Sequence, residues 1–359
     1  MPLVHHKPLP SFKHLEERGQ TILSLEEALR QNIRELHIGL LNMMPDAALK
    51  VTEQQFMRLI GNCNQIAQFY VHVFSIPGLP RGAEAQEYID QHYESFEDLK
   101  KEGLDALIIT GTNVSNPDLQ EEPFWAPLKE VVEWGSNNTT SILCSCLATH
   151  ALMKMDYQVD RVPLPQKKWG VFEHYVTQPF HPLLRDINTR FNVPHSRHND
   201  ISHEQFDAMD LSILVESKEG GVHIAVSHDQ FRRVYFQAHP EYDFNSLLKE
   251  YKREVLRYIN KERADYPPHP QHYFSEEAAY IADQFHQAVL DAEQDPTLEC
   301  PPFPEKELER HVDNTWGDTG KAIFNNWLGL VYKLTNLDRT LPFAEDVNPD
   351  DPLRLLGLE

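Results

Sequence analysis

The sequence predicts an α/β fold in which helices cover both faces of a parallel sheet, with a short antiparallel strand meander and C-terminal helices added. Up to about residue 155, continuous apolar runs of strand length alternate with stretches of helical spacing. Strands that are buried on both faces of a parallel sheet have this appearance. Beyond residue 170, strand-like runs follow one another with short connections, which favours antiparallel pairing. The chain has 359 residues and is 41% hydrophobic, which is enough for one large core or two modest ones.

The expected elements of the first half follow from these runs. Apolar runs predict strands at residues 35–42, 68–76, 104–110 and 140–145. Helices are predicted between and after them at residues 52–60, 93–101, 122–135 and 147–155. In the first of these helices, Phe56, Leu59 and Ile60 recur at the spacing that places apolar side chains on one helix face. Parallel strands need such crossover helices, so the alternation supports a parallel sheet.

The second half of the chain begins with strands and ends with helices. Strands are predicted at residues 171–176, 190–193, 211–215, 222–227 and 233–237, of which the last three form the meander. Helices are predicted at residues 243–258, 275–292 and 318–334, with Pro-rich connections at 266–274 and 295–304. The predicted domains are an N-terminal arm (1–34), a catalytic α/β domain (35–265), and a C-terminal helical extension and tail that pack on the core (266–359). We expect the polar stretch from residue 338 to be held loosely.

The charge and composition exclude several classes of partner. A formal net charge of −22 repels the phosphates of nucleic acids and anionic membranes, so we expect neither as a partner. No apolar run approaches the ~20 residues of a membrane span, and the N-terminus has no apolar signal core. The cysteines Cys63, Cys144, Cys146 and Cys300 are few and irregularly spaced, which is typical of reduced thiols in the cytoplasm. An anionic substrate would need a local basic patch.

No metal site is predicted, although the chain contains 19 histidines. Cys144 and Cys146 are two residues apart and have no second pair of ligands nearby in the sequence. The His5–His6 pair and the histidines at positions 195, 198 and 203 lack a convincing ligand spacing. We therefore expect neither a metal ion nor a bound cofactor.

Cys146 is the strongest candidate for a nucleophile. It stands in the segment Ser145–Leu147, where a buried strand gives way to a helix, and a side chain on such a turn projects above the carboxyl edge of the sheet. Backbone N–H groups in the first turn of a helix favour a thiolate and bind an oxyanion. Ligands of open α/β sheets bind at this same edge. The alternative for a single cysteine in an apolar run is a small core residue.

His239 and Glu241 form the second part of the predicted site. His239 follows a strand and precedes a helix, so it lies at the carboxyl edge as well, and Pro240 fixes the turn. Glu241 can return to hydrogen-bond the imidazole and set its tautomer. A third strand ends in the segment 110–112, where glycine lets the backbone approach a reacting carbonyl, and we assign the oxyanion hole to it. Each segment alone also fits an ordinary turn, but together with Cys146 they predict a catalytic site.

Seven longer segments carry a resemblance to a known family. They are LNMMP (41–45), TEQQFMRLIGN (52–62), LIITG (107–111), GVFEH (170–174), PHSR (194–197), HPEYD (239–243) and FNNWL (324–328). In their order and spacing the chain resembles the class I glutamine-amidotransferase-like superfamily, which has a flavodoxin-like sheet. More narrowly, it resembles the homoserine O-acyltransferases, which comprise homoserine O-succinyltransferases and their acetyl-transferring relatives. The resemblance extends from about residue 38 to residue 334.

The resemblance implies roles for individual side chains. It places Cys146 on the acylated nucleophile, His239 on the general base and Glu241 on the partner that orients the base. The positions implied to bind the amino-acid substrate are Lys167, Ser196, Arg197 and Arg253. Independently of the family, an arginine on the helix after HPEYD suits bidentate binding of an α-carboxylate. The alternative for Lys167 and Arg253 is a solvated surface position, and for Ser196 a turn.

Three further features concern the oxyanion hole, the acyl donor and the Met-Pro loop. The predicted oxyanion hole consists of Gly111, Thr112 and Leu147. Ser115 occupies the position at which glycine accompanies succinyl donors and glutamate accompanies acetyl donors in the family. Serine is small and uncharged, so it favours a succinyl donor. The link after the Met-Pro loop, at residues 46–50, is longer than is usual in the family, and Lys50 is the candidate replacement for a lysine that relatives have there.

The resemblance implies an acyl-CoA-dependent O-acyltransferase of methionine biosynthesis. It would transfer a succinyl or acetyl group to the hydroxyl of L-homoserine through an acyl-cysteine, with ping-pong kinetics and acyl-CoA as co-substrate. Relatives are commonly homodimers. The alternatives are the same chemistry with another amino alcohol such as serine, a glutamine-amidotransferase-like hydrolase, and a small-molecule sensor without turnover. Against the hydrolase, Cys144 and Ala148 stand where amidotransferase turns usually carry glycines.

Overall fold

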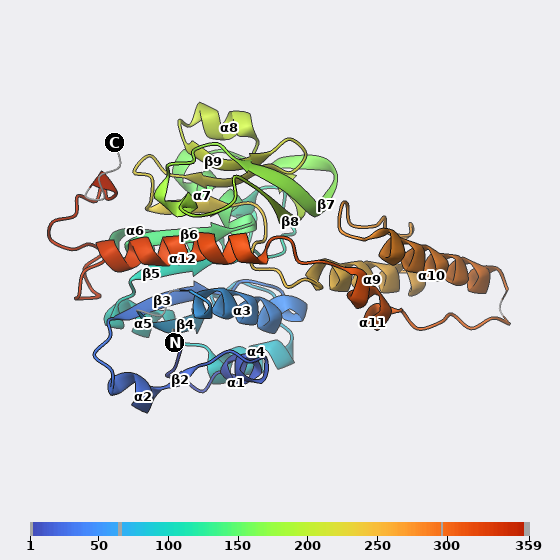
Figure 1. The fold of residues 1–359 in the computed structure, drawn as a ribbon, viewed down its shortest axis with the longest axis horizontal. Coiled ribbons are helices and arrows are strands. Elements are labelled where there is room, and N and C mark those ends of the chain that lie inside the picture. The colour runs from blue at the N-terminus through green and yellow to red at the C-terminus, as the bar shows by residue number, and fades with distance from the viewer. Residues whose placement is uncertain (1–2, 64–66, 296, 355–359) are drawn as a thin grey trace.

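The computed structural model describes residues 3–63, 67–295 and 297–354 (Figure 1). Within these residues, nine strands form one mixed sheet in the order β4-β3-β5-β6-β11-β10-β9-β7-β8. The strands are β3 (Glu35–Leu41), β4 (Gln68–Phe74), β5 (Ala106–Ile109), β6 (Ser141–Ser145), β7 (Val162–Val176), β8 (Arg190–Asp200), β9 (Ser212–Ser217), β10 (Gly221–Val226) and β11 (Arg233–Phe236). A separate parallel pair, β1 (Val4–His5) and β2 (Leu23–Ser24), lies near the N-terminus.

The first part of the sheet is parallel, as the alternation of strands and helices predicted. β3 pairs with β4 and β5, and β6 pairs with β5 and β11, all in parallel. Parallel neighbours end at the same edge of a sheet, so the carboxyl ends of β5, β6 and β11 lie side by side. This edge gathers the three segments that the sequence assigned to a catalytic site.

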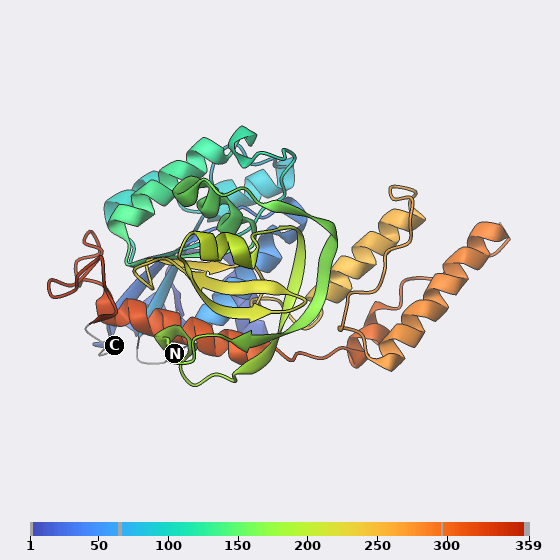
Figure 2. The same ribbon diagram turned by 90° about the horizontal axis from the view of Figure 1, so that it is seen from above.

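Helices cover both faces of the parallel part (Figures 1 and 2). On one face, α3 (Asp46–Gly61) and α12 (Gly317–Leu334) share a buried cluster with Ile108 of β5. On the other face, α5 (Phe96–Glu102), α6 (Trp125–Asn138) and α7 (Leu147–Tyr157) share a cluster with Leu107 of the same strand. Successive residues of a strand point to opposite faces, which is why a continuous apolar run was needed. The predicted fold class is confirmed.

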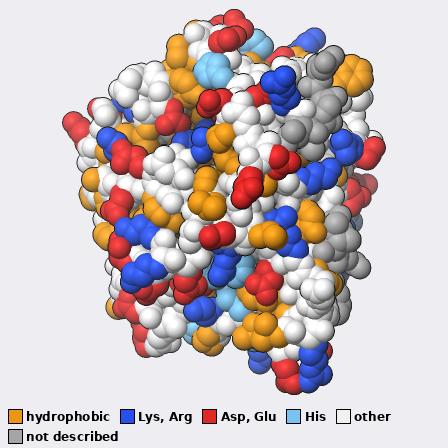
Figure 3. All heavy atoms as spheres, turned by 90° about the vertical axis from the view of Figure 1, so that its left-hand side faces the viewer, with side chains coloured by type: hydrophobic (Ala, Val, Ile, Leu, Met, Phe, Trp, Pro, Cys, Tyr) orange, Lys and Arg blue, Asp and Glu red, His pale blue; other side chains and the backbone are white. Residues whose placement is uncertain are grey.

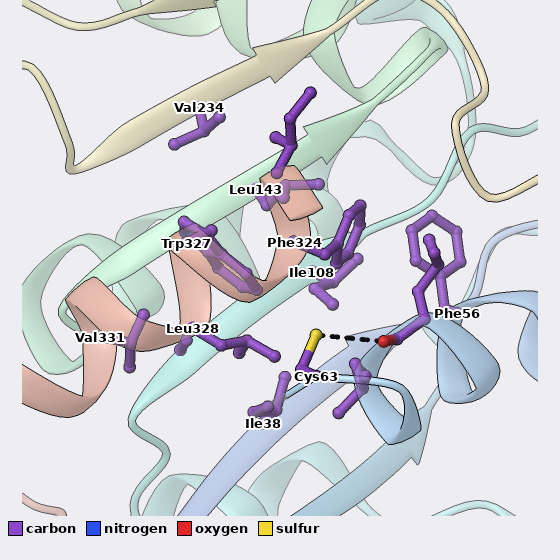
Figure 4. Close-up of a cluster of buried hydrophobic side chains, with 14 of the residues drawn as sticks. Ile38, Phe56, Cys63, Ile108, Leu143, Val234, Phe324, Trp327, Leu328 and Val331 are labelled. Carbon is purple, nitrogen blue, oxygen red and sulfur yellow. Dashed lines mark hydrogen bonds between the residues drawn. The ribbon is translucent and has the colours of Figure 1, made fainter. Parts of the chain in front are cut away.

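Helix α12 comes from the far end of the chain and closes one face of the core. Figure 4 shows Phe324, Trp327 and Leu328 reaching toward the strands and toward Phe56 of α3. The indole Nε1 of Trp327 donates a hydrogen bond of 2.9 Å to the hydroxyl of Ser141 in β6. The FNNWL segment is therefore part of the packed core.

The antiparallel part of the sheet is larger than the predicted meander. β10 pairs antiparallel with β11 and β9, β9 pairs with β7, and β7 pairs with β8. The sequence predicted strands only at 171–176 and 190–193, whereas β7 begins at Val162 and β8 continues to Asp200. The missed half of β7 contains two prolines and is largely exposed, so it carries no apolar run. Pairing with β8 rather than burial makes it a strand.

Several helices differ from the prediction. α3 begins at Asp46 rather than at residue 52, so the long link after Pro45 forms the first turns of this helix. α4 (Ala83–His92) was not predicted, because only Ala85 and Tyr88 of it are buried. The shorter unpredicted helices are α1 (Pro10–Glu17), α2 (Leu25–Leu29), α8 (His203–Ala208) and α11 (Glu305–Leu308). Helices with so few apolar positions have a weak sequence signal.

The C-terminal part of the chain both projects from the body and returns to it. α9 (Ser246–Ile259) and α10 (Glu276–Gln294) extend away from the sheet in Figures 1 and 2. They form a buried cluster of their own, which Trp169 of β7 joins. The stretch from residue 338, expected to be held loosely, instead buries Phe343, Val347 and Leu353 in the same cluster as α12. Residues 355–359 of this predicted tail lie outside the described residues.

The face of the molecule in Figure 3 carries charges of both signs. On the face shown in Figure 3, acidic, basic and hydrophobic side chains are interspersed. Among the described residues, no helix is both long enough and apolar enough to cross a membrane. The division into arm, catalytic domain and extension stays a prediction.

Candidate active site

Cys146 occupies a sharp turn between β6 and α7. Its backbone angles, φ 52° and ψ −113°, lie in a region that residues with side chains rarely adopt. Its N–H donates to the carbonyl oxygen of Phe236, at the end of β11, over 2.8 Å. Cys146 is partly exposed, whereas Cys63 and Cys144 are buried. Strained backbone of this kind clusters at functional sites, and the turn presents the thiol at the start of a helix.

His239 and Glu241 lie just after β11 and are joined by a hydrogen bond. The Nδ1 atom of His239 lies 2.7 Å from Oε1 of Glu241, and both residues are at least 95% buried. The backbone N–H of His239 donates to the carbonyl oxygen of Pro194 in β8 over 2.9 Å, which fixes the turn. Because a carboxylate only accepts, the neutral imidazole carries its proton on Nδ1 and leaves a lone pair on Nε2.

The imidazole of His239 interacts with the thiol of Cys146. Burial alone would lower the pKa of His239, but the charge of Glu241 and the charge and hydrogen bonding of Cys146 raise this pKa well above its ordinary value. The Nε2 atom of the ring is buried and has no aligned hydrogen-bond partner among the described residues. Catalytic hydrogen bonds are often poorly aligned in unliganded sites and tighten when substrate binds. The arrangement can therefore hold a thiolate beside an imidazolium.

Gly111 brings the end of β5 against the cysteine turn. A Cβ atom at this position would lie 3.4 Å from Cβ of Cys146 and 3.5 Å from the backbone nitrogen of Leu147. The N–H of Leu147 is the first of α7, so no carbonyl of its own helix accepts from it. Thr112 follows Gly111, and its hydroxyl donates to the carbonyl of Asn113. The backbone at these positions thus borders the thiol where the sequence placed the oxyanion hole.

A buried carboxylate, Glu250 of α9, gathers two of the predicted substrate-binding residues. Its Oε2 lies 3.1 Å from Nζ of Lys167 and accepts a hydrogen bond of 2.7 Å from the hydroxyl of Ser196. Its Oε1 accepts a hydrogen bond of 2.8 Å from the hydroxyl of Tyr242. Burial alone would raise the pKa of Glu250, but Lys167 and the hydroxyls of Ser196 and Tyr242 lower it below its ordinary value.

Tyr242 connects this carboxylate to His239. Its ring stacks on the imidazole of His239, with centroids 4.4 Å apart and planes inclined by 17°. Burial and the charges of Glu250 and Glu241 raise the pKa of Tyr242 well above its ordinary value. The charge of Cys146 adds to this effect, which shows that Cys146 is near. The Glu250 group therefore lies next to Cys146, the predicted nucleophile.

The structure does not bring two of the predicted substrate-binding residues to this group. Arg197 is 3% exposed and points its guanidinium at Asp200 Oδ1 (3.0 Å) and the carbonyl of Gly220 (2.6 Å). It follows Ser196 in β8, and successive side chains of a strand point to opposite faces. The side chain of Arg253 is 53% exposed and its Nε lies 3.6 Å from Oε1 of Glu254. Arg253 follows Glu250 by one helical turn, so it stands at the rim.

Glu122 and Arg161, which the sequence analysis missed, hydrogen-bond to the backbone of the loop after β5. The backbone N–H groups of Ser115 and Asn116 donate to Oε1 of Glu122, over 2.6 and 2.7 Å. The guanidinium of Arg161 donates to the carbonyl of Asn116 over 2.9 Å and to that of Pro117 over 3.3 Å. Its Nη1 is buried and has no hydrogen-bond partner among the described residues. A free cationic donor thus lies beside the loop that carries Ser115.

Lys50 does not take the place in the site that its sequence position suggested. Its ammonium group lies 4.5 Å from the ring centroid of Tyr88 in α4 and 3.9 Å from Oε1 of Glu84. The helical first turns of α3 direct it there. The same helix supports the site through Arg58, which donates to the backbone carbonyl of Glu241 over 2.8 Å and pairs with Asp243 at 2.7 Å.

A groove of about 350 Å³ on α9 offers the basic patch that an anionic substrate needs. Its lining residues are Lys249, Lys252, Arg253, Leu256, Arg257 and Asn260. Part of its positive charge is paired, since Lys252 contacts Glu305 at 2.5 Å and Arg257 contacts Glu254 at 3.2 Å. Over the described residues, the one cluster of three side chains able to hold a metal ion involves none of the site residues.

Glu250 and Tyr242 are the main site residues that the sequence analysis missed. A signal for Glu250 was present, because it lies three residues after the buried Leu247 and one before the buried Tyr251 in an otherwise amphipathic helix. A carboxylate on the apolar side of a helix is rarely buried without a partner. Tyr242 follows HPE directly, but nothing in the sequence showed that its ring would return to His239.

Comparisons with known proteins assign the family. Residues 2–337 match the sequence family described as "HTS: Homoserine O-succinyltransferase". The chain is 58% identical to a homoserine O-succinyltransferase of Methylococcus capsulatus, over 99% of this chain and 100% of the relative. It is 56% identical to one of Methylobacter tundripaludum with the same coverage. A solved glutamine amidotransferase of Methylobacillus flagellatus aligns with a TM-score of 0.42 at 14% identity, over 83% of this chain and 95% of that one. The chain therefore belongs to the homoserine O-succinyltransferase family, a family of acyltransferases, as its sequence motifs predicted.

Proposed function

We propose that this protein transfers a succinyl group from succinyl-CoA to the hydroxyl of L-homoserine, in methionine biosynthesis, through an acyl-enzyme on Cys146. The observation that carries the proposal is the buried His239–Glu241 pair beside a strained cysteine at the start of a helix. The relatives named homoserine O-succinyltransferase support this donor and this acceptor, because the chain matches them over their whole length.

In the first half-reaction, the thiolate of Cys146 attacks the thioester carbonyl of the acyl-CoA and a C–S bond to the enzyme forms. The negative charge on the carbonyl oxygen is stabilised by the N–H of Leu147 and the backbone after Gly111. The C–S bond to CoA then breaks, and His239 gives its proton to the departing thiolate. One thioester replaces another, so the acyl group is kept in a reactive form.

In the second half-reaction, homoserine binds where CoA has left. Its carboxylate meets the guanidinium of Arg253, which would have to turn inward from its pair with Glu254, and its ammonium group meets the carboxylate of Glu250. His239 removes the proton of the γ-hydroxyl, the oxygen attacks the acyl carbon, and Cys146 leaves as a thiolate. Two half-reactions through one covalent intermediate give ping-pong kinetics.

The basic groove on α9 is the proposed site of the CoA phosphates. Lys249 and Lys252 line it together with Arg253, which places it within one helical turn of Glu250. The net charge of −22 repels an anionic substrate, and the positive side chains of the groove offset this repulsion locally. The acyl end of the donor would then point toward Cys146.

Arg161 is the proposed partner of the succinyl carboxylate. The Ser115 loop begins at Gly111, beside the nucleophile, and Arg161 binds this loop with one part of its guanidinium while Nη1 has no described partner. A guanidinium nitrogen that is buried without an acceptor favours an anionic ligand. An acetyl group carries no carboxylate, so this contact would favour succinyl-CoA over acetyl-CoA.

We expect replacement of Arg161 by glutamine to lower kcat/KM for succinyl-CoA by about 10–100-fold, the range for a hydrogen bond to a charged group. The value for acetyl-CoA should change far less, because that donor lacks the carboxylate. Steady-state kinetics with both donors measure the difference, and Arg161→Lys should restore part of it. Equal losses with both donors would mean that Arg161 only supports the loop.

A donor-by-acceptor matrix tests the proposed function. The protein is incubated with succinyl-CoA or acetyl-CoA, each with homoserine, serine or glutamine, and the products are identified by mass spectrometry. O-succinylhomoserine should form fastest. Preferential acylation of serine would replace the acceptor, and release of ammonia from glutamine without acyl transfer would replace the reaction class. The homodimer stays a prediction, which light scattering on the purified chain would test.

A further inference from the structure

A second group of ionisable side chains lies at β4, on the opposite border of the parallel strands from β11. His72 is in the middle of β4, Glu94 follows α4, and His6 follows β1. A ring nitrogen from each histidine and an oxygen of Glu94 all lie within 4.8 Å of one another. The N-terminal segment runs beside β4 here, since Leu3 bridges Phe69. Three segments that are distant in the sequence thus aim three potential ligand atoms at one point.

The orientation of the His6 ring is fixed by its own backbone. Its Nδ1 lies 3.1 Å from the carbonyl oxygen of Val4, which can only accept, so the proton of the neutral ring is on Nδ1. Nε2 then carries a lone pair, and this atom is buried with no hydrogen-bond partner among the described residues. It faces Oε1 of Glu94 at 3.8 Å, and the His6 side chain is 94% buried. In the neutral ring, a lone pair of His6 therefore faces a carboxylate oxygen of Glu94.

His72 is oriented by a chain of side chains behind it. Its Nε2 lies 2.8 Å from Nδ1 of His37, and Nε2 of His37 lies 3.2 Å from a carboxylate oxygen of Glu35. Because a carboxylate only accepts, Nδ1 of His72 donates to Oε1 of Glu94 over 3.0 Å. A bound metal ion would replace this proton, and Nε2 of the ring would then donate toward His37 and Glu35. Metal-binding histidines are usually held in this way, by donating their second N–H to another residue.

We infer that His6, His72 and Glu94 form a binding site for a divalent transition-metal ion of the Zn²⁺ class. Two imidazole nitrogens and one carboxylate are ligands that Zn²⁺ accepts, with a fourth position left for water. The three atoms would have to approach by a small movement to reach the bond lengths of about 2.0–2.2 Å that Zn²⁺ requires. Neither the spacing of His5–His6 nor any local motif revealed this set, and the inference departs from our sequence-based expectation of no metal.

The site would act as a clamp between the N-terminal segment and the sheet. Among the lysines and arginines that the structure describes, Lys7 alone contacts the carboxylate, at 3.4 Å from Oε2 of Glu94, and this leaves Oε1 for the metal. Because His6 comes from before α1 and His72 from β4, a bound ion would hold together segments that otherwise meet through the bridge between Leu3 and Phe69 and through ring contacts of His6 with β4. The ion would stabilise the fold and take no part in the chemistry at Cys146, which lies at another strand of the sheet.

The test uses the full chain after removal of metal with a chelator. We expect it to bind one Co²⁺ with the intense visible bands of tetrahedral coordination, to bind Zn²⁺ in competition with a chromophoric chelator, and to melt at a higher temperature with Zn²⁺ than without. Glu94→Gln and His6→Ala should each weaken Zn²⁺ binding by more than about 100-fold, beyond the usual loss of an outer-shell partner. His5→Ala is the matched control, because His5 is the exposed neighbour and should leave binding unchanged.

Two results would overturn the site. One is a full chain that gains no tetrahedral Co²⁺ spectrum and no stability from Zn²⁺, in which case a proton shared by His6 and Glu94 holds the group together. The other is Zn²⁺ binding that survives in both Glu94→Gln and His6→Ala, which would place the ion on other histidines. Neither result depends on acyl transfer, so the proposed function is tested separately.

Discussion

Replacement of Cys146 by alanine will abolish both acyl transfer and the covalent intermediate. The thiol stands at φ 52° between β6 and α7, with the imidazole of His239 beside it, and its nearest cysteine neighbour, Cys144, is buried in the core. Among the described residues, no other thiol has an imidazole partner of this kind to replace it. We expect kcat to fall by on the order of 10⁴-fold or more, since removing the nucleophile of such a group leaves only binding and the oxyanion hole.

The measurement is the intact mass of the protein after incubation with succinyl-CoA and no acceptor. The wild-type chain should gain the mass of one succinyl group, and addition of homoserine should remove it. Cys300→Ser is the matched control, because Cys300 is an exposed free thiol that would report non-specific acylation, and this variant should behave like the wild type. An adduct that persists in Cys146→Ala would contradict the mechanism.

The parallel part of the fold was predictable because burial there is complete. Every residue of β5 is buried, and Leu107 and Ile108 of this strand enter different core clusters, so the run had to be apolar throughout. The amino-terminal half of β7 has the opposite character: it is exposed and contains prolines, and only its partner β8 makes it a strand. Such long-range pairing leaves little trace in the local sequence.

The proximity of the proposed catalytic residues was predictable for a related reason. Cys146 and His239 each follow a strand of the parallel part, and the topology brings the ends of these strands to one edge. Glu250 and Tyr242 were missed because their role depends on how α9 and the HPEYD turn pack, which no strand end marks. Arg197 was assigned to the substrate with its neighbour Ser196, yet alternation along β8 turns it into a buried pair with Asp200. Adjacent residues of a strand seldom share one site.

Replacement of His239 by glutamine should lower kcat/KM by on the order of 10²–10⁴-fold, because both half-reactions lose the group that moves the proton. Glutamine fills a similar space and retains a polar end, so the fold should survive the change. Glu241→Gln is a graded companion: it preserves shape and removes the charge that holds the imidazolium. We expect its loss of activity to be smaller than that of His239→Gln, since the base itself remains.

The pH dependence of the thiol distinguishes these roles. Together, Glu241 and Cys146 outweigh burial and raise the pKa of His239, so the imidazolium persists to higher pH and stabilises a thiolate beside it. Without the charge of Glu241 the pKa of His239 falls, so the imidazolium that favours a thiolate beside it is lost at a lower pH. The rate of alkylation of Cys146 by iodoacetamide, measured against pH, should therefore shift to higher pH in Glu241→Gln. Glu219→Gln removes the carboxylate from an exposed pair with His272, 2.9 Å apart, and should leave the curve in place. An unshifted curve in Glu241→Gln would mean that Glu241 positions the ring without influencing its charge.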